Sequence, residues 1–174
     1  MRKNRIITPI VASAALLVLG AGPAMAAATD ATFTITGGSL AITAPVGPVA
    51  LGTAPASPGT QAIGAALGNV TVTDGRGGVA GWVASVISTA FTPAAPAVAV
   101  TASAVVYATP AATVTGTSTV TAQHANGPIG VMPVQTATTV SGANTATWSP
   151  TVTVNVPAGA MPGVYAATLT HSVV

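Results

Sequence analysis

Apolar and polar residues alternate with a period of two along much of this chain. Residues 70–73 read Val-Thr-Val-Thr, and residues 151–156 read Thr-Val-Thr-Val-Asn-Val. β-Branched residues in strict alternation are typical of strands that bury one face. No window carries the 3.6-residue apolar stripe of a helix. The pattern predicts strands at residues 32–36, 39–44, 69–73, 81–89, 97–107, 112–121, 135–140, 146–156 and 164–173.

Turn residues separate these predicted strands. Asp74-Gly75 and Gly77-Gly78 predict a hairpin over residues 69–89. Gly127-Pro128 and residues 157–163 are further breaks. Residues 45–67 are rich in Pro, Gly, Ala and Ser and predict a long loop, with room for a short strand near 49–51. Many short strands joined by turns predict an all-β fold, an antiparallel β-sandwich of immunoglobulin-like or Greek-key type.

The first 26 residues have the pattern of a secretory signal peptide. Arg2, Lys3 and Arg5 form a basic head, an apolar run covers residues 6–21, and small residues follow up to Ala26. This order predicts cleavage after Ala26, with Ala28 as the alternative site. The apolar run is short and interrupted for a membrane span, which needs about 20 residues. We therefore expect a secreted protein with one domain at residues 27–174 and no membrane span after cleavage.

Removal of the signal would leave a nearly uncharged chain. Three of the four basic residues lie in the first five positions, and only Arg76 remains beside Asp30 and Asp74. Nucleic-acid binding needs several Lys or Arg residues to displace counterions, so this class of function is excluded. Cysteine is absent, so disulfides cannot stabilise the domain. Charge normally protects sheet edges from pairing with other chains, and its scarcity is a first indication of an interaction role.

Residues for catalysis are sparse. The titratable groups beyond the signal are Asp30, Asp74, His124 and His171. A glycosidase needs two positioned carboxylates, a zinc site needs three or four ligands, and no Gly-x-Ser-x-Gly nucleophile motif occurs. We expect no enzymatic activity, no cofactor and no metal.

Six residues are candidates for binding. Asp74 and Arg76 form a polar pair at the predicted hairpin tip, although a turn Asp commonly caps its own backbone amides while the Arg stays solvated. The aromatic side chains could stack on sugar rings or anchor the core. The core interpretation is favoured for Trp82 and is balanced for Trp148. The candidates are Trp82, Asp74, Arg76, Trp148, Tyr165 and His171.

Three segments together resemble a known family. They are residues 67–82, which end in Gly-Trp after an Asp-Gly-Arg-Gly turn, residues 146–157, and residues 163–173 with a Gly-Val-Tyr start. The chain resembles the WxL surface domain of Gram-positive bacteria, closest to the variant in actinobacterial secreted proteins. In that family one Trp-x-Leu motif follows a turn with Asp and Arg, and a second lies in the final strand. The resemblance implies a secreted β-sandwich at the cell surface, with peptidoglycan as the usual ligand.

Both motifs differ from the family pattern. The first reads Trp82-Val83-Ala84, with Ala where the family has Leu. In the second, His171 stands at the Trp position and Val173 at the Leu position. Alternation along the last strand puts Tyr165, Leu169, His171 and Val173 on one face, so we expect His171 to pack in place of Trp.

Two functions follow from these observations. The first is a secreted, non-catalytic protein associated non-covalently with the Gram-positive cell wall, through peptidoglycan or another surface protein; no Leu-Pro-x-Thr-Gly sorting motif occurs. The alternative is a self-assembling or pilin-like structural subunit that uses exposed sheet edges for strand addition. A wall binder should be a monomer that sediments with peptidoglycan, whereas a subunit should form oligomers without any wall.

Overall fold

The computed structural model describes residues 27–93, 98–101, 104–123 and 129–174. From Ile35 onward the chain forms one compact unit. The predicted signal peptide, His124 and the Gly127-Pro128 break lie outside the described residues. The described strands are β1 (Leu40–Thr43), β2 (Gln61–Ala66), β3 (Val70–Asp74), β4 (Trp82–Ser88), β5 (Thr92–Pro93), β6 (Val105–Ala108), β7 (Thr113–Ala122), β8 (Met132–Trp148), β9 (Thr151–Val156), β10 (Tyr165–Ala166) and β11 (Leu169–Val173).

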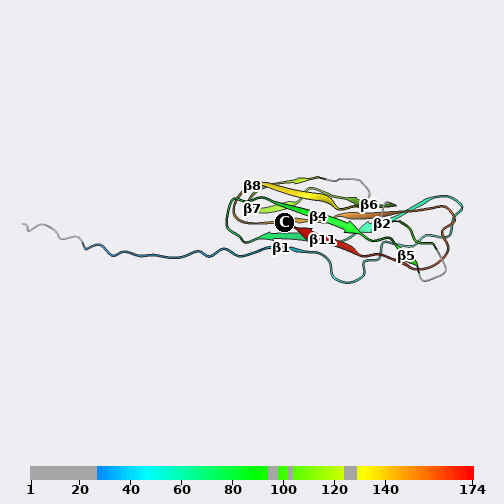
Figure 1. Cartoon of the computed structure of the whole chain (residues 1–174), viewed down its shortest axis with the longest axis horizontal. Coiled ribbons are helices and arrows are strands. Elements are labelled where there is room, and N and C mark those ends of the chain that lie inside the picture. The colour runs from blue at the N-terminus through cyan, green and yellow to red at the C-terminus, as the bar shows by residue number, and fades with distance from the viewer. Residues whose placement is uncertain (1–26, 94–97, 102–103, 124–128) are drawn as a thin grey trace, which may run out of the picture. The chain divides into compact units, whose positions relative to one another are not determined.

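These strands confirm the prediction of an all-β, antiparallel fold. Every strand pair is antiparallel, and the described residues contain no helix. Accordingly, no helix in this part of the chain has the length and hydropathy to cross a membrane. The strands form a six-stranded, a three-stranded and a two-stranded sheet (Figure 1).

The long strand β8 organises the largest sheet. β7 pairs with β8 along one edge, from the Thr113 and Thr147 pair to the Ala122 and Gln135 pair. The other edge carries two strands end to end, with β3 opposite Asn144–Trp148 and β4 opposite Met132–Ala137. β1 pairs with β3, β11 pairs with β4, and β1 and β11 lie next to one another. The path of paired strands β1-β3-β8-β4-β11 therefore nearly closes on itself.

The predicted hairpin over residues 69–89 is wrong. β3 and β4 do not pair with each other, because both pair with β8, and residues 75–81 loop out between them. The Gly-rich sequence that resembles a hairpin turn is thus a loop between two strands that follow one another along the same edge of β8. β8 is irregular opposite this interruption: Thr139 and Gly142 have positive φ angles of 53° and 75°. The amide of Gly142 donates to the carbonyl of Gly78 at 3.0 Å, which ties the loop to β8.

The three-stranded sheet begins where β8 ends. The sequence predicts one strand over residues 146–156, but Ser149-Pro150 breaks it, and β9 continues into a different sheet between β2 and β6. Proline lacks the N–H that a ladder requires, which explains the break. The Pro150 carbonyl accepts a hydrogen bond from the amide of Leu67 at 2.8 Å. β2 itself lies within residues 45–67, which the sequence analysis assigned to a loop.

Three further segments differ from the sequence-based prediction. Residues 32–36 form no strand and are exposed, although their alternation is strand-like. No strand forms near residues 49–51, and β8 is 17 residues long and joins the strand predicted at residues 135–140 to the start of the one predicted at residues 146–156. Periodicity alone does not predict these boundaries, because a segment also needs the edge of a neighbouring strand to pair with before it forms a strand.

The core is one cluster of alternating side chains from both larger sheets. β3 and β4 bury every second residue, including Val70, Val72, Trp82 and Ala84, and β9 buries Val152 and Val154. Burying a Val side chain contributes about 1.5–3 kcal/mol relative to leaving it exposed. The core therefore relies on many small β-branched residues around a few aromatic rings.

The close contact of β4 with β8 leads to a first prediction. Gly81→Ala should lower the free energy of unfolding by about 1–3 kcal/mol, because its Cβ would overlap the backbone oxygen of Ala137. Gly78→Ala, in the same loop, is the control, since a Cβ there meets nothing within 4 Å. Urea unfolding measured by Trp fluorescence compares the two variants. Equal losses would contradict this placement of β4.

Candidate functional site

Asp74 and Arg76 form a closed ion pair at the start of the 75–81 loop. The Arg76 guanidinium donates through Nε to Asp74 Oδ1 and through Nη2 to Asp74 Oδ2, both at 2.9 Å. The Arg76 backbone amide also donates to Oδ1 at 3.1 Å. Asp74 thus caps its turn, as the sequence suggested, but Arg76 is not simply solvated, because it folds back onto the carboxylate.

The same guanidinium closes the loop at its other end. Arg76 Nη2 donates to the carbonyls of Ala80 and Gly81, both at 3.1 Å. The Asp74 side chain is 2% exposed, and the Arg76 side chain is 33% exposed. The hydrogen bonds from Arg76 lower the pKa of Asp74, against the opposing effect of burial. The pair therefore acts as a clamp across the interruption between β3 and β4, and its carboxylate is not available to a ligand.

Trp82 is part of the core. Its side chain is 2% exposed, and its indole N–H lies 3.4 Å from Oδ1 of the buried Asn144 on β8. A ring that is buried on both faces cannot stack on a sugar. The core interpretation that the sequence favoured is confirmed for this residue.

Trp148, Tyr107 and His171 form a hydrogen-bonded chain across the two larger sheets. Trp148 lies on β8 and donates its indole N–H to the Tyr107 hydroxyl on β6 at 3.3 Å. The Tyr107 hydroxyl is 3.0 Å from Nε2 of His171 on β11. Trp148 and Tyr107 are 2% and 1% exposed. Two of the candidate binding residues, Trp148 and His171, are therefore brought together, with Trp148 buried and His171 half-buried.

The surroundings of His171 favour a neutral imidazole. The Tyr107 oxygen accepts from Trp148, and the tautomer of His171 sets whether the Tyr107 hydroxyl or Nε2 donates in the hydrogen bond between them. Burial lowers the pKa of His171 and raises the pKa of Tyr107 to about 12. Nδ1 of His171 is buried without a hydrogen-bond partner among the described residues. A neutral imidazole fits this environment, in agreement with the packing role expected for His171.

Tyr165 is a half-buried candidate near the surface. It lies on β10 and is half-buried, and its hydroxyl donates to the carbonyl of Met161 at 2.9 Å. Tyr165, Leu169 and Val173 all pack against the core, which confirms that alternation puts them on one face. The ring of Tyr165 borders a cavity.

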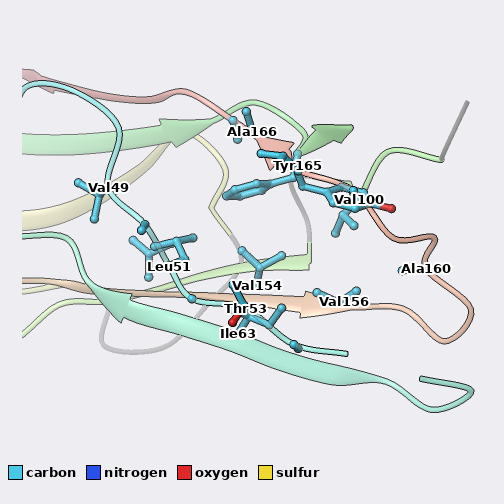
Figure 2. Close-up of a pocket in the computed structure, with 18 of the residues that line it drawn as sticks. Val49, Leu51, Thr53, Ile63, Val100, Val154, Val156, Ala160, Tyr165 and Ala166 are labelled. Carbon is cyan, nitrogen blue, oxygen red and sulfur yellow. The ribbon is translucent and has the colours of Figure 1, made fainter. Parts of the chain in front are cut away.

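This cavity is an apolar groove that the sequence analysis missed. It has a volume of about 970 Å³ and lies among β2, β9, β10, β11 and residues 44–57. Figure 2 shows Tyr165 and Val100 on one side of the gap and Ile63, Val154 and Val156 on the other, with Leu51 between them. None of the lining residues is Asp, Glu, Lys or Arg. The sequence signal was weak: Val49, Leu51 and Ile63 are large aliphatic residues within a stretch of Ala, Gly and Pro.

The described residues do not assemble a metal centre. No group of three or more His, Cys, Asp or Glu side chains comes together in this part of the chain. Asp74 is engaged by Arg76, and His171 by Tyr107.

No protein-family model, no curated protein and no solved structure matched this chain. The class that the structure defines is an antiparallel all-β domain with an apolar groove, and the resemblance to WxL domains stays a prediction.

The Tyr107 hydroxyl gives a second prediction. Tyr107→Phe should lower the free energy of unfolding by about 1–3 kcal/mol, because it leaves the buried Trp148 N–H without its acceptor. Tyr165→Phe, which removes a partly exposed hydroxyl, should change the free energy by less than about 0.5 kcal/mol. Denaturant unfolding compares the two. A small effect in both would show that the chain across the sheets adds no stability.

The Asp74 clamp gives a third prediction, on pH. Because the folded pKa of Asp74 lies below its ordinary value of 3.8, its contribution is fully present above that pH and is lost as the pH falls through the folded pKa. The difference in melting temperature between the wild type and Asp74→Asn should therefore be largest at neutral pH and shrink below about pH 3.8. Asp30→Asn, at an exposed position, is the control. A difference that stays constant down to pH 2 would contradict the clamp.

Proposed function

We propose that this chain is a secreted, non-catalytic domain of the cell surface that works as a structural subunit. Its apolar groove would bind an extended segment of protein. Secretion rests on the signal-like pattern of residues 1–26. A β-sandwich of immunoglobulin-like or Greek-key type is the fold we propose, and the single hydrophobic cluster shared by the two larger sheets supports it.

The groove is the observation that carries this proposal. Its lining is mostly aliphatic, with a few polar side chains such as Gln61 and His171, and holds no formally charged residue. A strand with apolar side chains at every second position can place one face in such a groove, which is the usual mode of strand addition. A glycan would instead need a row of polar groups and open aromatic faces. Burial of Trp82 and Trp148 removes two of those faces.

Non-covalent association with the cell wall is the second candidate. It rests on the resemblance to WxL domains, and one observation favours it: Tyr165 is half-buried at the groove, where part of its ring could meet a polymer. Peptidoglycan or another wall polymer would then be the ligand. The two candidates differ in whether a wall is needed for any association.

Two variants separate these candidates. Ile63→Glu puts a charge into the groove wall, and Ile87→Glu puts the same charge on β4 at a 43% exposed position outside the groove. We expect the mature chain, residues 27–174, to associate with rising concentration in light-scattering chromatography without any wall. Ile63→Glu should abolish this association, because an unpaired charge is costly in an apolar site. Ile87→Glu should leave it intact.

Sedimentation with purified peptidoglycan sacculi completes the test. A monomer at every concentration that binds sacculi saturably would contradict the subunit proposal and favour wall binding. Circular dichroism of each variant checks that the strands are retained.

A further inference from the structure

One exposed segment of this chain has an apolar face that is complementary to the apolar groove. Residues 31–36, Ala-Thr-Phe-Thr-Ile-Thr, are here called the leading segment. All six residues are exposed, with Phe33 at 87% and Ile35 at 85%, and none belongs to a strand. Two large apolar side chains on one face of a strand-like sequence would be stabilised by burial. The segment therefore has the sequence of a strand but pairs with no other strand in the described structure.

The groove lies beside one open sheet edge. β2 is the outer strand of the three-stranded sheet and pairs only with β9 within the described residues. β11 pairs with β4 on one side, and β1 lies next to it. Ile63 of β2 and Leu169 of β11 both line the groove. Unpaired N–H and C=O groups at such edges are a template for an added strand.

The segment that now covers the groove cannot supply that strand. Residues 45–56 contribute Val49 and Leu51 to the lining. No backbone-to-backbone hydrogen bond joins them to β2 or β11 in the described structure. Pro45, Pro48 and Pro55 lack the N–H groups that a ladder needs. This cover therefore leaves the edge of β2 free for pairing.

We propose that the leading segment of one copy inserts as an added strand into the groove of a second copy. This inference rests on the proposed function and names the inserted segment. Phe33 and Ile35 would enter the apolar lining, and the backbone would pair with the open edge of β2. Both sides are free of formal charge, so no charge would be buried on insertion.

The geometry of this contact has a consequence for assembly. Each copy offers one inserted segment and one groove, so the contact is head-to-tail rather than self-complementary. Contacts of this kind extend into open chains unless their rotation closes a ring. The mass should therefore keep growing with concentration instead of stopping at a dimer.

A pair of matched double variants tests the proposal in the mature chain. Phe33→Glu with Ile35→Glu charges the apolar face of the leading segment. Thr32→Glu with Thr34→Glu adds the same charges to the opposite face, and all four positions are exposed. In light-scattering chromatography we expect growing oligomers for the wild type and the Thr pair. The Phe33 and Ile35 pair should weaken assembly by about tenfold or more.

A synthetic peptide of residues 29–38 measures the binding directly. By calorimetry it should bind the Phe33→Glu, Ile35→Glu variant saturably at one peptide per chain, and it should not bind after Ile63→Glu is added. Assembly that survives the Phe33 and Ile35 substitutions but is lost in Ile63→Glu would overturn this inference and leave the subunit proposal standing. A wild type that stays monomeric would overturn both.

Discussion

The hydroxyl of Tyr107 is the central directional contact between the two larger sheets. It accepts from Trp148 on β8 and is bonded to His171 on β11, while its own strand belongs to the other sheet. Without disulfides and with one ion pair among the described residues, few other directional contacts fix one sheet against the other. The remaining core is small aliphatic side chains, which pack closely but carry little directional information. Burial at this junction lowers the pKa of His171 and raises the pKa of Tyr107 to about 12, which favours the neutral form of both side chains.

Alternation in the sequence predicted the fold class and most inward-facing residues, because a strand that buries one face must repeat every second residue. Val70, Val72, Val152 and Val154 are all buried as this rule requires. Partner choice was beyond the sequence. The same turn residues, Asp74-Gly75 and Gly77-Gly78, are compatible with a hairpin and with a loop between two strands on the same edge of a sheet. Only the pairing of β3 and β4 with one edge of β8 decides between them.

The candidate site shows the same limit. The sequence marked three residues as candidates for binding: Trp82, Trp148 and His171. In the structure they instead make contacts that hold the interior together. The groove arises from strands distant in sequence and from residues 44–57, whose composition resembles a simple loop. The exposure of Phe33 and Ile35 is likewise invisible to periodicity. Together the groove and the leading segment favour an assembly function over sugar binding.

The central position of β8 also determines when the molecule can fold. Thr71 on β3 bonds Thr147 on β8, although the two are 76 residues apart in the sequence. The strands on both sides of β8 therefore cannot form their hydrogen bonds with it until nearly the whole chain is present. Folds dominated by such distant contacts are slow, because the loop-closure entropy is lost before the contacts form. For a protein predicted to cross a membrane before it folds, this delay would keep the chain unfolded through export.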